Sequence, residues 1–89
     1  MKFYSTLELS KGYEVWKALF DKTGPQMRSI GLKAIYVGCE ANNENKVHMI
    51  FEVPSLEPVK KLMADPEIHQ KRVEAGVIVD SQGLIPLAD

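Results

Sequence analysis

The sequence predicts an α+β domain in which an antiparallel sheet carries its helices on one face, in the order β-α-β-β-α-β. Residues 32–53 contain two runs rich in β-branched and aromatic residues around a polar connection, which is typical of a β-hairpin. On each side of this hairpin lie one helical pattern and one further strand pattern. We expect residues 1–89 to form a single domain, because a chain of this length supports one core.

The first strand is expected over residues 2–9, where hydrophobic residues alternate with polar ones. A helix follows, because apolar residues recur at steps of three and four, at Tyr13, Trp16, Leu19 and Phe20. The Gly24-Pro25 pair breaks this pattern, since proline suits the first turn of a new helix. The first helical region should therefore consist of two short helices.

The central hairpin is expected to have a five-residue connection at 41–45, which contains three Asn residues that tolerate left-handed backbone angles. The strand before it places three residues on the apolar face: Ile35, Val37 and Cys39. The strand after it places four there: Val47, Met49, Phe51 and Val53. Pro54 ends that strand because it has no N–H to donate.

The second helical region begins with an apolar stripe at Leu56, Val59, Leu62 and Met63. Asp65-Pro66-Glu67 predicts a second helix start, and Gly76 predicts its end. Residues 77–79 and 84–87 flank a polar segment at 80–83. They form either one last strand with a bulge or two short strands.

The strand alternation separates two faces of the sheet. The apolar face must meet the helices, because both are too hydrophobic for water. The other face is amphipathic and aromatic, with Tyr4, Thr6, Tyr36, His48, Ile50 and Glu52. We expect these six residues to form a homodimer interface, since tyrosine is favoured at such interfaces and a chain this short has a small core.

The composition limits the kinds of molecule and the cellular setting that we expect for this protein. A net charge of −1 and the lack of a clustered basic stretch argue against nucleic-acid binding. The single Cys39 excludes an intrachain disulfide and a paired-cysteine zinc site, and it suits a reducing compartment. No signal-peptide pattern or apolar run of about 20 residues indicates a membrane protein. We expect a soluble cytoplasmic protein without a metal or cofactor.

The chain length, the element order, the Gly-Pro break and the segment ADPEIHQKRVEAGV at residues 64–77 resemble the dimeric α/β-barrel superfamily, in an uncharacterised small-protein branch. This resemblance implies a ferredoxin-like fold, two sheets facing each other in a dimer, and a pocket between the sheet and the helices. Members include cofactor-free monooxygenases acting on polycyclic phenols and haem-degrading enzymes. The haem-degrading pattern of a first-strand Asn and a second-helix Trp is not matched, because this chain has Tyr4 and Thr6 in that strand.

Four residues are candidates for the pocket: Tyr13, Trp16, Met63 and His69. His69 falls at helical spacing from Leu62, Pro66 and Val73, so its ring could point inward as a general base or remain an ordinary boundary histidine. Trp16 and Tyr13 could stack on an aromatic ligand or simply fill the core.

His48 shares its strand face with Glu52, near the face positions of Glu8, Tyr4 and Tyr36. Such a cluster forms either an acid/base pair or a polar network at a subunit interface, and the second reading is favoured because buried polar groups need partners. Cys39 lies on the apolar face and is expected to be an inert small hydrophobe.

Three hypotheses about function follow. The first is a homodimeric protein that binds a small apolar or aromatic molecule in a helix–sheet pocket. The second is a cofactor-free monooxygenase-like enzyme acting on an aromatic substrate. The third is a structural or assembly module without a pocket. The volume and lining of the interior distinguish them, because ligand sites are apolar cavities with a few convergent polar groups.

Overall fold

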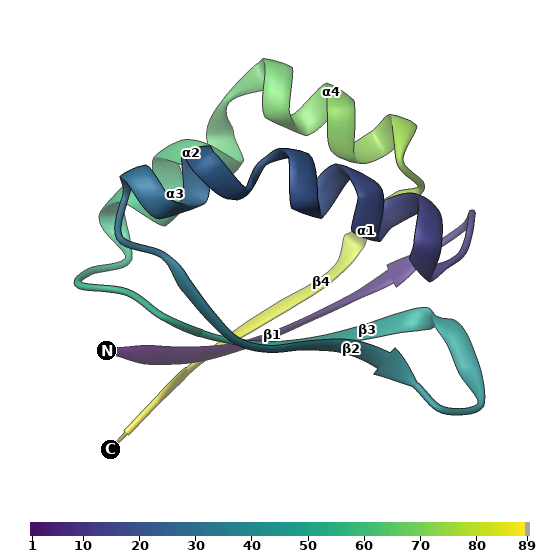
Figure 1. Ribbon diagram of the computed structural model, residues 1–89, viewed down its shortest axis with the longest axis horizontal. Helices are drawn as coiled ribbons and strands as arrows, with labels where there is room; N and C mark the ends of the chain where they lie inside the picture. The colour runs from purple at the N-terminus through teal and green to yellow at the C-terminus, as the bar shows by residue number, and fades with distance from the viewer. Residues whose placement is uncertain (89) are drawn as a thin grey trace.

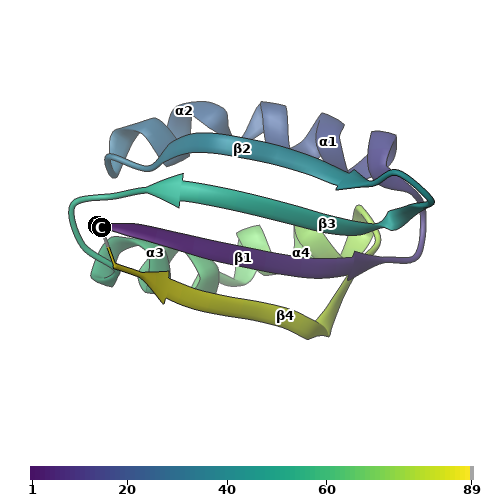
Figure 2. The same cartoon turned by 90° about the horizontal axis from the view of Figure 1, so that it is seen from below.

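The computed structural model describes residues 1–88 and has the predicted order, with each helical region split into two helices. The elements are β1 (Lys2–Leu9), α1 (Tyr13–Lys22), α2 (Gly24–Ser29), β2 (Lys33–Glu40), β3 (Asn43–Glu52), α3 (Glu57–Ala64), α4 (Pro66–Glu74) and β4 (Val77–Leu87). The strands form one antiparallel sheet in the order β2-β3-β1-β4. All four helices lie on one face of this sheet (Figure 1), and the other face carries none (Figure 2). The ferredoxin-like α+β prediction is therefore confirmed.

The core lies between the sheet and the helices, on the face that the strand alternation predicts. Its buried members lie on strands, on helices and in the loops that connect them. They are Phe3, Leu7, Leu9, Trp16, Leu32, Val47, Met49, Phe51, Val53, Val59 and Val77. Removing a side chain of this kind from water contributes about 1.5–3 kcal/mol, so this cluster is the main source of stability.

The alternation predicts Ile35 on the core face of the sheet, and this prediction is wrong. Ile35 is 49% exposed, because the register shifts between Ala34, which pairs with Phe51, and Tyr36, which pairs with Ile50. The extra residue is a β-bulge, which changes the face of the residues on one side of it. Val37 keeps its predicted contact with the core.

The connection in the hairpin is shorter than predicted. Glu40 pairs with Asn43, so only residues 41–42 lie between the strands. Among residues 1–88, no residue other than glycine has a positive φ, so the expected left-handed Asn is also wrong. The Asn side chains bond elsewhere: Asn45 N donates to Asn43 Oδ1 (3.0 Å), and Gly12 N donates to Asn45 Oδ1 (2.9 Å). This second bond ties the hairpin to the start of α1.

The last strand is continuous and bulged, as the first of the two alternatives predicts. Thr6 pairs with Gly83 but Glu8 pairs with Ile78, so β4 carries extra residues opposite Leu7. The bulge is held by Ser81, whose Oγ accepts a hydrogen bond from Glu8 N at 2.8 Å. It also brings Gln82 to α4, where Arg72 Nη2 donates to Gln82 Oε1.

The ends of α4 follow their sequence signals. Asp65 is the N-cap, and its Oδ1 accepts a hydrogen bond from Glu67 N at 2.8 Å. Gly76 follows the helix with φ +94°, a conformation that favours glycine. Within residues 1–88, none of the helices has the length and apolar character that crossing a membrane would require.

Candidate ligand-binding cavity

A cavity of about 260 Å³ lies between the sheet and the helices. Its walls are mainly hydrophobic, because β1 and β3 turn their buried faces toward the buried sides of α1, α3 and α4. The sheet contributes Phe3, Leu7, Met49 and Phe51, and the helices contribute Trp16, Val59 and Ile68. This arrangement offers an apolar molecule a site shielded from water.

Aromatic rings form a continuous chain along this cavity. Phe3 and Phe51 have centroids 5.3 Å apart, Phe51 and Phe20 6.1 Å, and Phe20 and Trp16 5.1 Å, and all four residues line the cavity. Tyr13 lies next to Trp16, with centroids 5.8 Å apart, but is not part of the lining. Burial raises the pKa of the Tyr13 phenol. Tilted ring pairs of this kind stabilise the wall by about 0.5–1.5 kcal/mol each.

The cavity opens where its exposed lining residues lie, on α3, α4 and β4. These are Met63, Lys71, Gln82 and Leu84. Arg72 lies among them but is half-buried, and burial lowers the pKa of its guanidinium from the ordinary value. The charged and amide side chains of the site are thus concentrated at its mouth, while the rest of the lining is mainly apolar apart from the hydroxyls of Ser5 and Thr23.

Two of the four residues predicted for the pocket line the cavity and two do not. Trp16 and Met63 line the cavity, and Tyr13 supports Trp16 from behind. His69 is exposed and lies outside the lining, so a molecule bound there would meet Arg72 rather than His69.

The phase of α4 explains this placement. The inward side of the helix carries Ile68 and Arg72, followed by Ala75 after its last turn. His69 would face inward only if the helix were rotated about its axis by one residue. Sequence reasoning missed Arg72, although its spacing of four from Ile68 and three from Ala75 is the signal that finds it.

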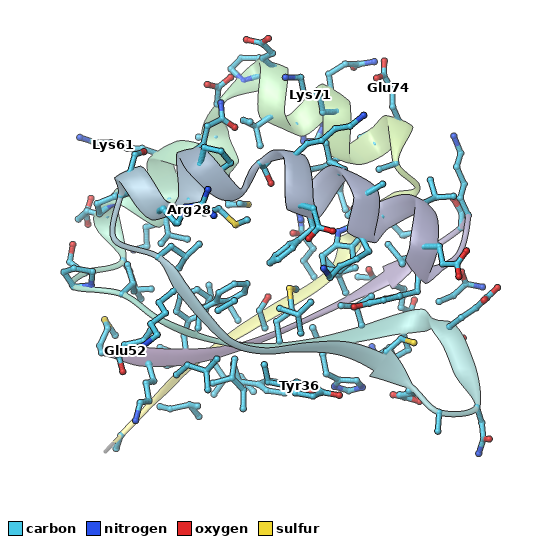
Figure 3. All side chains as sticks on the ribbon, viewed as in Figure 1. Arg28, Tyr36, Glu52, Lys61, Lys71 and Glu74 are labelled. Carbon is cyan, nitrogen blue, oxygen red and sulfur yellow. The ribbon has the colours of Figure 1, made fainter. Side chains whose placement is uncertain are left out.

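The uncovered face of the sheet carries the residues expected at a dimer interface. A row crosses all four strands, because Tyr36 pairs with Ile50, Ile50 with Tyr4, and Tyr4 with Ile85. Tyr36 lies on the side of the sheet away from the helices (Figure 3). It is 52% exposed and Ile85 is 56% exposed, so the row forms an apolar, aromatic stripe. Sequence reasoning missed Ile85 because the bulge hides the alternation of β4.

Tyr4, Thr6 and His48 on this face each have a hydrogen-bond partner. The Tyr4 hydroxyl hydrogen-bonds His48 Nδ1, and His48 Nε2 is 2.7 Å from Glu40 Oε2. Thr6 Oγ1 donates to the Val47 carbonyl at 3.0 Å. The partner of His48 is thus Glu40 rather than Glu52 or Glu8.

The carboxylates of Glu8 and Glu52 lie away from this chain of hydrogen bonds. Glu8 Oε1 lies 3.8 Å from Lys46 Nζ, which forms an ion pair with it. Glu52 is exposed near one end of the sheet, where it pairs in register with Lys2 and Lys33. Within the described part of the chain, no group of three or more His, Cys, Asp or Glu residues is arranged to hold a metal ion.

Two solved structures share this fold across almost the entire chain. Protein Atu4242 from Agrobacterium tumefaciens aligns with a TM-score of 0.63 and 19% identity, covering 99% of this chain and 94% of its own. A Deinococcus radiodurans protein proposed to be an antibiotic biosynthesis monooxygenase aligns with a TM-score of 0.51 and 11% identity, covering 99% and 92%. At these identities the likeness shows the fold, and it agrees with the resemblance to dimeric α/β-barrel proteins.

No curated protein matches the sequence. The family described as "Domain of unknown function (DUF3764)" matches residues 4–84, which is nearly the entire chain. Most of the cavity lining, most of the uncovered sheet face and the bulges lie within this matched region, whereas Phe3 and Ile85 lie just outside it. The chain therefore belongs to the DUF3764 family.

Proposed function

We propose that this protein binds a small apolar or aromatic molecule in the cavity between its sheet and its helices. The observation that supports this is the cavity of about 260 Å³, which has a mainly apolar lining and a few polar side chains, most of them at its mouth. A cavity of this kind is typical of a ligand site, whereas a module that serves only assembly has no need of one. The aromatic rings of the wall can stack on the ring of an aromatic ligand.

Titration with 2-naphthamide, a neutral aromatic probe, tests this proposal by isothermal calorimetry. Leu84→Trp places a large ring at the mouth and should weaken binding about tenfold or more. Val73→Trp is the matched control, because Val73 on α4 is exposed to a similar extent (44% against 47%) but does not line the cavity. Lack of binding to the unmodified protein, or an equal effect of both variants, would contradict the proposal.

A cofactor-free monooxygenase is the second candidate. The observation that favours it is the set of four aromatic side chains on the wall, Phe3, Trp16, Phe20 and Phe51, together with the fold shared with the D. radiodurans protein. An electron-rich phenol such as 1-naphthol would supply the electrons itself: one O₂ converts it to 1,4-naphthoquinone and one water. Oxygen uptake equal to quinone formation, and lost in Leu84→Trp, is the expected result for this candidate.

We also infer that the protein is a homodimer that pairs through its uncovered sheet face. The stripe of Tyr36, Ile50, Tyr4 and Ile85 supports this, because a continuous apolar patch on a small domain usually marks an interaction site. The Tyr4 hydroxyl and both ring nitrogens of His48 are already paired through Tyr4–His48–Glu40, so a second copy can cover these atoms without leaving them orphaned. A two-fold copy buries the same patch twice.

Sedimentation equilibrium at micromolar concentration tests this assembly. The unmodified chain should sediment at twice its mass of 10.0 kDa, and Ile85→Asp should reduce it to a single chain that remains folded. Val15→Asp is the control, because Val15 is also about half exposed but lies on α1, on the helical side of the molecule. A 10.0 kDa species for the unmodified chain would refute the dimer.

A further inference from the structure

Arg72 is a half-buried cation at the mouth of the cavity, beside its largely apolar interior. It lies one turn after the buried Ile68 on α4, and both residues line the cavity. Its guanidinium donates to the neutral amide oxygen of Gln82. Within residues 1–88, no carboxylate lies within ion-pair distance of Arg72, whereas the neighbouring Lys71 has its Nζ 3.8 Å from Glu67 Oε1.

This environment is unfavourable for a charge that remains unpaired. A guanidinium has five N–H donors, and the oxygen of one neutral amide cannot accept hydrogen bonds from all of them. Burial removes water from the group, which is why the pKa of Arg72 falls. A half-buried cation gains most from an anion, because charge-assisted hydrogen bonds are stronger than neutral ones and the site is partly shielded from water.

The β4 bulge positions this cation. Gln82 lies in the bulged segment, and its side-chain amide donates to the Val79 carbonyl at 3.3 Å while its oxygen accepts from Arg72. The guanidinium is therefore fixed at the mouth of the cavity, between the apolar interior and solvent. A ligand whose hydrophobic body enters the cavity would leave a terminal group within reach of Arg72.

We propose that the ligand of this cavity is a small aromatic or aliphatic carboxylic acid, whose carboxylate binds Arg72 while its apolar part lies against the aromatic wall. This inference rests on the proposed ligand-binding function and specifies its ligand class. Arginine suits the role because its planar fork matches the two oxygens of a carboxylate. Lys71 is less suited, because it is exposed and already close to Glu67.

The experiment compares 2-naphthoate with 2-naphthamide, which has the same ring system but no charge. Isothermal calorimetry should give about tenfold tighter binding of the carboxylate to the unmodified protein, in line with a charged hydrogen-bonded contact. Arg72→Gln should lower the affinity for 2-naphthoate more than the affinity for 2-naphthamide and so remove this preference. Lys71→Gln should retain most of the preference, since that side chain is solvated.

If Arg72→Gln does not fold, a second variant, Gln82→Glu, tests the same proposal. Gln82→Glu supplies an internal carboxylate beside Arg72, so it should also abolish the preference for 2-naphthoate while the neutral probe still binds. Equal binding of both probes to the unmodified protein, or an unchanged preference in Gln82→Glu or in a folded Arg72→Gln variant, would overturn the assignment of Arg72 and leave the binding function standing. Failure of both probes to bind would instead remove the binding function.

Discussion

Phe51→Ala should be among the most destabilising single changes in this chain. Phe51 is 5% exposed and lies between Phe3 and Phe20 in the aromatic wall. Replacing a buried Phe by Ala typically costs about 3–5 kcal/mol. One side of this ring borders the cavity of about 260 Å³, so it has fewer contacts to lose than a ring packed on every side. We therefore expect the lower end of the range, about 3 kcal/mol.

Urea unfolding followed by circular dichroism measures this loss directly. A domain of 89 residues has about 4–13 kcal/mol of stability in total, so the variant should fold but with a much lower midpoint. The same change corresponds to a drop in Tm of about 12–24 °C. The slope of the unfolding free energy against urea should stay constant, because the surface exposed on unfolding is nearly the same.

Ile35→Ala is the matched control for this measurement. Simple alternation would place Ile35 and Phe51 on one face, but the bulge in β2 leaves Ile35 exposed. Its replacement should cost less than about 1 kcal/mol. An unchanged midpoint for Phe51→Ala, or an equal loss for Ile35→Ala, would refute the assignment of the two strand faces.

Three further predictions concern single residues. Asp65→Ala removes the acceptor for Glu67 N and should cost about 0.5–2 kcal/mol in urea unfolding, while Asp65→Asn should recover most of it. Gly76→Ala forces a Cβ into a positive-φ site and should cost about 1–2 kcal/mol. Gly24→Ala, within α2 and without positive φ, should cost less, because the atom nearest to the added Cβ is the end of the flexible Arg28 side chain, at 3.1 Å. Ultraviolet titration should show Tyr13 ionising above its ordinary pKa of 10.0, and Tyr13→Phe should lose that late transition. Because the unfolded chain deprotonates first, Tyr13 stabilises the fold below pH 10 and loses that contribution as pH rises through the folded pKa.

Most of the fold is predictable from local patterns. Strand alternation identifies the buried side of β1 and β3, as at Phe3 and Val47, and start and stop signals such as Asp65 and Gly76 locate α4. These signals are read from neighbouring residues, so no tertiary information is needed. The bulges cannot be predicted in this way, because an extra residue such as Ile35 is recognisable only against the strand with which it pairs.

The candidate site is less predictable for the same reason. Trp16 and Met63 belong to apolar stripes that any core-facing helix shows, and both reach the cavity. The residue type of Arg72 does not indicate a position in the cavity wall, because an arginine on a short helix is usually solvated. Its position depends on the phase of α4 and on Gln82, which the bulge in β4 brings from a distant element.

The bulges also affect how copies of this chain can associate. β2 and β4 are the two outer strands of the sheet, and each departs from regular pairing, at Ile35 in one and between Ile78 and Gly83 in the other. A regular outer strand offers a ladder of free backbone groups onto which a foreign strand can add, and an irregular one interrupts that ladder. Growth of the sheet by side-to-side addition, the route to fibrils, is therefore hindered at both margins. Self-association would then proceed through the exposed stripe that includes Tyr36 and Ile85, as we propose, and stop at a dimer.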